Sequence, residues 1–239
     1  MRIGAITRAV APIHGRDRLM SSESNAVRQI PVLHGRFWAK QMAGVARTAE
    51  TRVLEVGCGK GESLALLLGK KIDAYGFDLG AAPQLLAPKD HYAFGSLSSA
   101  MTFPQHHFDL VVVRPIAAFR GELSTPEHYV ATANLLSCVK PAGKLVIVEP
   151  SQGRDGVAAQ DWLDRWQKQL TAFTVDKTVR DYRDGLGWLL SFGFLSKSPK
   201  LDLRTIMLTT PAQPVTRLEW HRQARAAVMP KSKTGRRAA

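Results

Sequence analysis

The chain has 239 residues, of which 45% are hydrophobic and 22% charged, and this composition is that of an ordinary folded domain with a full core. No apolar run approaches the roughly 18 residues that a membrane-spanning helix needs, and two cysteines are too few for a disulfide scaffold. The reduced thiols predict a cytoplasmic protein. An organelle is the alternative if the arginine-rich first residues are a targeting segment.

The net charge of +13 lies mostly at the two ends of the chain. Residues 1–36 carry six arginines against two acids, and residues 216–239 carry seven basic residues against one acid. The body between them is only mildly basic, which argues against a basic nucleic-acid groove across it. The two ends are either solvated tails or segments that bind a polyanion.

From residue 37 to residue 150, predicted helices and strands alternate. Apolar residues at helical spacing predict helices, and short apolar runs that end at glycine, proline or an acid predict strands. Helices are predicted at 37–48, in the leucine-rich run that ends at 68, at 82–86 and at 126–139. Strands are predicted at 53–56, 72–78, 91–94, 108–113 and 144–148, with a turn at 141–143. Such alternation indicates a parallel sheet with helices on both faces.

After Pro150 the pattern becomes helical. Apolar spacing predicts helices within 159–173 and 186–192, so residues 151–192 are predicted to be a helical insertion. A closing hairpin is predicted from 194–201 and 204–210, and a last helix from 214–228.

The stretch from Val53 to Leu68 is the most informative. A short buried strand is followed by glycines at positions 57, 59 and 61 and then by leucines at helical spacing. Glycine suits a tight strand-to-helix turn, because it tolerates positive φ and lets a ligand approach the backbone. The first N–H groups of the helix are then a docking point for a polar, nucleoside-type ligand.

Further marks follow this turn in order. Asp78 ends the second predicted strand, where a carboxylate can accept hydrogen bonds from both ribose hydroxyls. Gly95–Leu97 follows the third strand, Met101–Phe103 leads toward the fourth, and Lys140-Pro141-Ala142-Gly143 precedes the fifth. Over about residues 50–150 the chain resembles the class I S-adenosylmethionine (SAM)-dependent methyltransferases, in particular the UbiE-like type. An NAD site is the less favoured alternative, because the glycine spacing is Gly-x-Gly-x-Gly rather than Gly-x-Gly-x-x-Gly.

The resemblance implies an α/β Rossmann-like fold. Its mostly parallel seven-stranded sheet would have an antiparallel C-terminal strand and helices on both faces. The methyltransferase domain would cover 37–212, with 151–192 as a substrate cap. Residues 1–36 would be an N-terminal arm that can act as a lid, and 213–239 a helix with a basic tail.

The resemblance also implies SAM as cofactor and a set of residues that bind it. The glycine turn would bind the methionine end of SAM. The end of the second strand would bind the ribose, and the segment after the third strand the adenine. In that order the residues are Glu55, Gly57, Cys58, Gly59, Gly61, Asp78, Leu79, Ser96 and Leu97. Ser96 stands where the family often has an acid. A hydroxyl is a weaker acceptor than a carboxylate, so we expect lower cofactor affinity. No metal is predicted.

The predicted reaction is an in-line displacement, which requires alignment and the exclusion of water but fixes no catalytic residue. Arg114 is a candidate clamp for an anionic substrate or the cofactor carboxylate, or else forms a surface salt bridge. His128 and Tyr129 are candidates for a base or an orienting group, or else are ordinary helix residues.

We predict methyl transfer to a small or medium-sized molecule, without a predicted oligomeric state. One alternative is an RNA (rRNA) methyltransferase that uses the basic N- and C-terminal segments. The other is a non-catalytic, methyltransferase-like assembly or scaffold protein. The sequence Val113-Arg114-Pro115-Ile116 lacks the Asn-Pro-Pro-aromatic signature of enzymes that methylate the exocyclic amino groups of bases.

Overall fold

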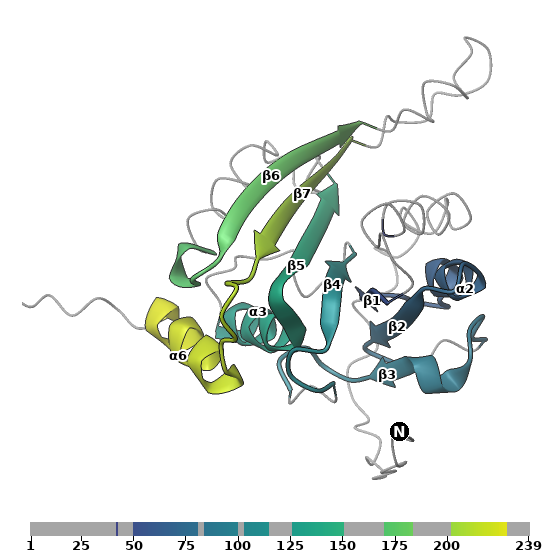
Figure 1. The fold of residues 1–239 in the computed structure, drawn as a ribbon, viewed down its shortest axis with the longest axis horizontal. Helices are drawn as coiled ribbons and strands as arrows, with labels where there is room; N and C mark the ends of the chain where they lie inside the picture. The colour runs from purple at the N-terminus through teal and green to yellow at the C-terminus, as the bar shows by residue number, and fades with distance from the viewer. Residues whose placement is uncertain are drawn as a thin grey trace, which may run out of the picture.

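In a computed structural model, the residues described are Met42 and the ranges 50–80, 84–99, 103–114, 126–150, 170–183 and 202–228. They form a seven-stranded sheet with helices on both faces (Figure 1). The strands are β1 (Arg52–Val56), β2 (Asp73–Asp78), β3 (Tyr92–Phe94), β4 (Phe108–Val113), β5 (Val139–Pro150), β6 (Asp176–Arg183) and β7 (Asp202–Thr209). The helices are α2 (Glu62–Gly69), α3 (Pro126–Cys138) and α6 (Arg217–Val228), with short 3-10 turns η1 (Lys89–His91) and η3 (Leu170–Ala172).

The strand order is β3-β2-β1-β4-β5-β7-β6. Strands β1 to β5 run parallel, and β7 lies antiparallel between β5 and β6. This arrangement confirms the Rossmann-like fold predicted from the sequence. The chain leaves the centre at β1 and returns to it at β4, and the carboxyl ends of the strands beside such a reversal open a crevice for ligands.

The two faces of the sheet carry two separate apolar cores. In β4, Val111 and Val113 belong to the core that contains α3 and α6, whereas Leu110 and Val112 belong to the core that contains α2. This alternation follows from the two-residue period of a strand. Trp220 of α6, which is 1% exposed, extends the first core beyond α3. Parallel strands buried on both faces explain why β4 is almost entirely apolar.

The element predictions hold best where a short element is strongly patterned. The predicted strand 108–113 is confirmed residue for residue, and the predicted strands β1, β2 and β3 and the helices α2, α3 and α6 are confirmed to within a few residues. The helix predicted at 82–86 is wrong for residues 84–86, which form bends and irregular backbone. Residues 82 and 83 lie outside the described part of the chain.

The turn predicted at 141–143 is present as an interruption inside β5. Val139 pairs with Phe108, but the next pair joins Lys144 to Leu110, so extra residues of β5 bulge out opposite Asp109. Ala142 takes a positive φ of 57° within this bulge. The structure therefore begins the strand five residues before the predicted position, with the predicted turn folded into it.

The predicted closing hairpin is wrong, because the last strand pairs with other strands than the one predicted. Strand β7 is hydrogen-bonded to β5 on one side and to β6 on the other, so no edge remains for residues 194–201. Strand β6 itself comes from the segment 151–192 that was predicted as helical, whose described part also holds η3. The rest of that segment, 194–201, the N-terminal arm and the basic tail lie outside the described residues, as does the helix 37–48 except for Met42, which is helical and buried.

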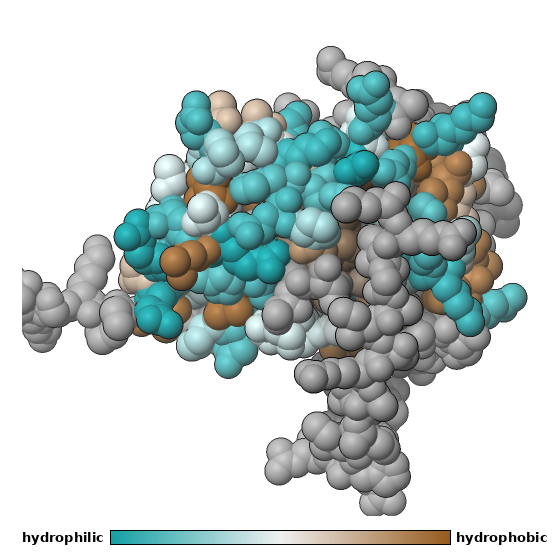
Figure 2. Space-filling model, turned by 60° about the horizontal axis from the view of Figure 1, so that its bottom comes forward, coloured by the Kyte–Doolittle hydropathy of each residue, from teal (hydrophilic) through white to brown (hydrophobic). Residues whose placement is uncertain are grey.

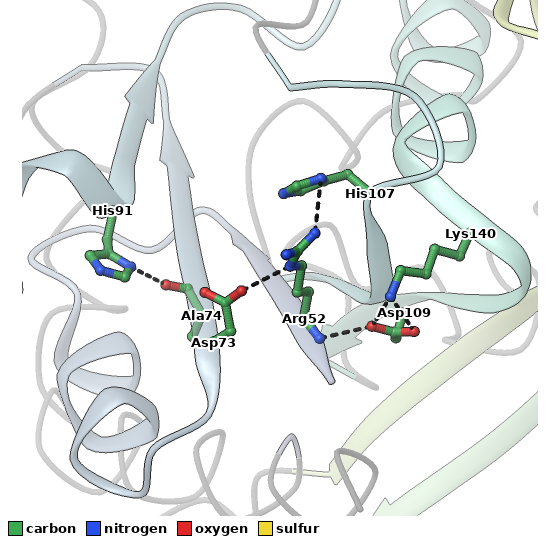
Figure 3. Close-up of polar contacts among 7 residues, drawn as sticks. All are labelled: Arg52, Asp73, Ala74, His91, His107, Asp109 and Lys140. Atoms are coloured by element: carbon green, nitrogen blue, oxygen red, sulfur yellow. Dashed lines mark hydrogen bonds and ion pairs between the residues drawn. The ribbon is translucent and has the colours of Figure 1, made fainter. Parts of the chain in front are cut away.

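The amino-terminal edge of the sheet is tied by charged side chains. Arg52 lies between the acids of the two neighbouring strands (Figure 3): its Nε donates to Asp73 at 2.9 Å and its backbone N–H to Asp109 at 2.8 Å. Lys140 donates to both carboxylate oxygens of Asp109, at 2.9 and 2.8 Å. The amino ends of β1, β2, β4 and β5 are thereby linked on the side of the sheet opposite the carboxyl ends.

Within the described ranges, no helix is long and apolar enough to cross a membrane.

Candidate functional site

The glycine turn between β1 and α2 lies at the carboxyl edge of the sheet. Gly57, Gly59 and Gly61 all have positive φ, at 80°, 55° and 80°. Gly61 is the N-cap of α2 and offers no side-chain cap, so the first N–H groups of the helix are left for another acceptor. A Cβ placed on Gly59 would meet no atom within 4 Å, so open space borders the turn at that point.

Asp78 connects the end of β2 to this turn. One carboxylate oxygen accepts the Gly59 N–H at 2.7 Å, and the other accepts the Leu79 N–H at 2.7 Å. A carboxylate offers about four lone-pair sites, so two acceptor sites remain for the two hydroxyls of a ribose. The structure thus brings Asp78 beside the glycine turn, as the sequence predicts, and leaves Leu79 77% exposed beside it.

Glu55 lies below the turn, fully buried on the face of the sheet that α2 covers. Ser63 of α2 donates to its carboxylate, and Nη1 of Arg114 lies 3.3 Å from Oε1. Burial raises the pKa of the Glu55 carboxyl, while Arg114 and Ser63 act in the opposite direction. The structure gives Arg114 an ion-pair partner inside the site and gives Glu55 two partners in the protein; their predicted roles toward ligands stay predictions.

Cys58 faces inward and is buried as a whole residue. Its side chain is 1% exposed, and its Sγ would be 2.7 Å from a Cβ placed on Gly76 of β2. Burial raises the pKa of the thiol to about 12, so the thiol stays protonated and is a poor nucleophile at neutral pH. Its main chain is engaged as well, because the N–H donates to the Phe77 carbonyl at 3.4 Å and the carbonyl accepts the Gly61 N–H at 2.9 Å. The predicted cofactor contact of Cys58 stays a prediction.

Tyr92 supports the turn from the opposite side. Its hydroxyl donates to the Lys60 carbonyl at 2.9 Å and accepts the Ala87 N–H at 3.2 Å. The Leu86 N–H donates to the same Lys60 carbonyl at 2.9 Å. The segment before η1 is thereby fastened to the glycine turn through a side chain from β3.

The loop after β3 carries Ser96 and Leu97. The Gly95 N–H donates to the Asp78 carbonyl at 2.9 Å, which places the start of this loop next to the end of β2. The Ser96 hydroxyl lies 2.8 Å from the Ser98 hydroxyl and accepts the Ser98 N–H at 3.3 Å, so it is already engaged within the loop. Leu97 is 6% exposed and packs into the core beneath α3.

The other two catalytic candidates lie in the first turn of α3. His128 is partly buried, and its backbone carbonyl accepts the Thr132 hydroxyl at 2.9 Å. Tyr129 is 7% exposed, and its ring centroid lies 6.2 Å from that of Phe173. Burial raises the pKa of the Tyr129 hydroxyl, which suits it to donating a hydrogen bond rather than to acting as a base. Both roles stay predictions.

The surface near the site is apolar on the side of α2 and β3. Figure 2 shows brown surface gathered on that side, while the side of α6 is mostly teal. Exposed large apolar residues of this half of the molecule are Leu66, Leu79, Leu86 and Phe94. Leu79 and Phe94 lie at the carboxyl ends of β2 and β3, beside the loop of Ser96. An apolar rim of this kind suits the flat face of a nucleobase.

The residues present fit SAM. Open space borders the turn at Gly59, Asp78 retains acceptor capacity, and the uncapped N–H groups of α2 suit a carboxylate such as that of the methionine end. Fold and site together define a class I methyltransferase architecture.

Comparison with known proteins agrees with this assignment. A family model described as a methyltransferase domain matches residues 26–181, and the chain belongs to this family. Membership confirms the predicted enzyme class, methyltransferase, and with it SAM as the methyl donor. The UbiE-like subtype stays a prediction. No curated protein sequence matches the chain.

Solved structures are similar to this chain at low sequence identity. A SAM-dependent methyltransferase from Archaeoglobus fulgidus is 13% identical, with a TM-score of 0.50 over 74% of this chain and 94% of that one. The YcgJ protein from Bacillus subtilis is 15% identical, with a TM-score of 0.49 over 74% and 99%. A 16S rRNA (adenine(1408)-N(1))-methyltransferase from Catenulisporales acidiphilia is 13% identical, with a TM-score of 0.49 over 74% and 94%.

Three residues of the site region escaped the sequence analysis: Ser63, Tyr92 and Asn134. Ser63 lies in the leucine run of α2 and is buried. A polar residue at a buried helical position was the sequence signal that could have indicated it. Tyr92 contacts the turn from 32 residues away, and nothing in the local pattern indicates that contact. Asn134 is a buried polar residue among apolar neighbours in α3, and its contacts are described below.

Proposed function

We propose that the protein transfers the SAM methyl group to a small or medium-sized molecule bound at the carboxyl edge of β1 to β4. One observation carries the choice of acceptor. At the carboxyl edge the strand-end cation Arg114 is paired with the buried Glu55, while Arg52 and Lys140, paired with Asp73 and Asp109, lie at the opposite edge of the sheet. Paired charges contribute little attraction for an extended polyanion, whereas a small acceptor needs only an enclosed site.

Bound SAM supplies an activated methyl group on a sulfonium, and the residues of this chain hold and orient it. The Gly57–Gly61 backbone and the start of α2 bind the methionine end, Asp78 accepts the ribose hydroxyls, and the loop of Ser96 and Leu97 borders the adenine. Arg114, which Glu55 holds in place, presents its remaining N–H donors to a carboxylate of the cofactor or the acceptor. Most of the rate then comes from alignment and from the exclusion of water.

Calorimetry with S-adenosylhomocysteine (SAH), the product form of the cofactor, tests the cofactor site. We expect the wild type to bind SAH and Asp78→Ala to bind it about tenfold more weakly or worse, because hydrogen bonds to a charged group are lost. Asp90→Ala, which removes an exposed acid of η1 at the opposite edge of the sheet, is the matched control and should bind normally. Absence of SAH binding by the wild type would refute the assignment.

Labelled SAM distinguishes the acceptor classes. The protein is incubated with the small-molecule fraction and, separately, with the RNA fraction of a cell extract. We expect label in the small-molecule fraction that depends on Asp78. Label found in RNA alone would overturn the proposed acceptor and leave the cofactor site intact.

RNA is the second candidate acceptor. In its favour, α6 exposes Arg225, together with Arg222, which is paired with Glu219, and the sequence continues into a basic segment. If those groups contact phosphates, deletion of residues 229–239 should weaken RNA binding and flatten its salt dependence. An unchanged affinity and slope would remove the support for this candidate.

A further inference from the structure

Asn134 joins three segments that are far apart in the sequence. The side chain lies in the middle of α3, and the residue is 3% exposed. Its amide nitrogen donates to the carbonyl of Leu97 at 2.7 Å and to the carbonyl of Ser99 at 2.8 Å. Its amide oxygen lies 2.9 Å from Nε2 of His221 in α6.

The partners determine which way the amide points. Both carbonyls can only accept hydrogen bonds, so the amide nitrogen must face them and the oxygen must face His221. His221 therefore carries its proton on Nε2 and donates it to Asn134. Burial and the nearby Arg217 lower the pKa of His221, so the neutral ring is the form present at neutral pH.

The carbonyls that Asn134 holds belong to the loop after β3. At its start, the Gly95 N–H is bonded to the Asp78 carbonyl at 2.9 Å. At its end, Asn134 holds Leu97 and Ser99. The loop is thus fastened on both sides of Ser96, to the end of β2 and to α3.

We propose that His221 and Asn134 are positioning residues for the adenine end of the cofactor: His221 anchors the amide of Asn134 through its oxygen, and the amide fixes the loop of Ser96 and Leu97. This rests on the proposed function, which puts adenine beside that loop. Without the His221 donor the amide keeps its bonds to the two carbonyls but loses the third bond that holds it in place. Binding must then order a looser loop, which lowers affinity.

The same reasoning predicts which kinetic constant changes. Adenine lies far from the sulfonium that reacts, so its contacts are alike in the ground state and the transition state. Loss of such uniform binding raises KM and leaves kcat unchanged. A general weakening of the fold would instead reduce the amount of active protein and lower the apparent kcat.

The test compares substitutions at two neighbouring positions of α6. His221→Ala removes the donor to Asn134. Gln223→Ala removes an acceptor for the Thr174 N–H, bonded at 2.9 Å, and has no bond to the loop, so it controls for damage to the helix. His221→Gln places an amide N–H near the position of Nε2 and serves as the conservative variant.

We expect His221→Ala to bind SAH about fivefold more weakly, the effect of one lost hydrogen bond. Its KM for SAM should rise by a similar factor with kcat unchanged. His221→Gln, or imidazole added to His221→Ala, should restore part of the affinity. Gln223→Ala should bind like the wild type even if its unfolding temperature falls.

Equal SAH affinity of His221→Ala and Gln223→Ala would overturn the inference, as would a lower kcat at unchanged KM. The wild type is measured first, so failure of the proposed function is recognised separately: a wild type that binds no SAH refutes the cofactor site itself. A wild type that binds SAH, with an unaffected His221→Ala, refutes only the role of the His221–Asn134 pair.

Discussion

At the scale of single residues, Gly61 leaves little room for a side chain. Its φ is +80°, and a Cβ there would lie 1.9 Å from the hydroxyl oxygen of Tyr92. In Gly61→Ala we expect both backbone strain and displacement of Tyr92, which would break its bonds to Lys60 and Ala87. Together these should lower the free energy of unfolding by about 2–4 kcal/mol. Denaturant titration measures the change.

Gly69→Ala is the matched substitution at the other end of α2. Gly69 is the last helical residue, and a Cβ there would meet nothing within 4 Å. Because alanine is the better helix former, this variant should be neutral or more stable by up to about 1 kcal/mol. If both alanine variants lost similar stability, the contact between the turn and Tyr92 would not be the cause.

Glu55 makes stability depend on pH. Burial raises the pKa of its carboxyl above the ordinary value of 4.5. The native state then keeps a proton that the unfolded chain has lost, so this group lowers stability as pH rises from about 4.5 through the folded pKa. We expect the stability of Glu55→Gln relative to the wild type to increase over that range, measured by denaturant titration at several pH values. Curves that stay parallel would contradict the raised pKa.

Single residues were predictable where their partners are close in sequence. The glycines and Asp78 belong to one strand-turn-helix-strand unit, whose pattern is visible in a single stretch. Asn134 and Leu97 are 37 residues apart, and Asn134 and His221 are 87 apart. No local pattern records such pairings, because they depend on how α3 and α6 pack together.

At the scale of elements, Asp109 links three strands. Its carboxylate accepts the Arg52 backbone N–H of β1 and the Lys140 ammonium of β5 (Figure 3). The Lys140 pair is about one third exposed on each side, so we expect Lys140→Ala to cost less than about 1 kcal/mol. Asp109→Ala should cost about 1–2 kcal/mol more than Asp109→Asn, which keeps an acceptor for the backbone N–H. Urea unfolding of the three variants decides this, and equal losses in both Asp109 variants would assign the stabilisation to charge instead.

Element boundaries were predictable where burial alone sets the pattern. Strand β4 is buried on both faces, so its apolar run begins and ends with the strand. Strand β6, Asp176–Arg183, has five charged residues among its eight and a single strand neighbour. Its apolar signal is correspondingly weak, and the helical spacing of the preceding residues dominated the prediction. The bulge in β5 was predicted as a turn, because Pro141 and Gly143 give the same local signal in a turn between elements and in a bulge within a strand.

At the scale of the whole molecule, β7 holds the sheet together. It provides the only described strand contacts between β6 and the rest, because β5 and β6 both pair with it. Proline in a central strand removes a ladder hydrogen bond, so Met207→Pro should unfold the β5-β7-β6 part and yield aggregated protein. Size-exclusion chromatography with circular dichroism measures this. A monomeric, folded Met207→Pro protein would show that the sheet does not depend on β7.

The position of β7 also matters during synthesis. Strands β1 to β5 are complete once residue 150 has been made, but the strand that covers the edge of β5 ends only at Thr209. At roughly 5–20 residues per second, translation of the intervening stretch takes about 3–12 seconds. During that time the nascent chain presents an unpaired parallel edge to the ribosome surface and to other chains. The half of the sheet with the glycine turn can therefore form first, and a factor that shields the β5 edge would have its effect in this interval.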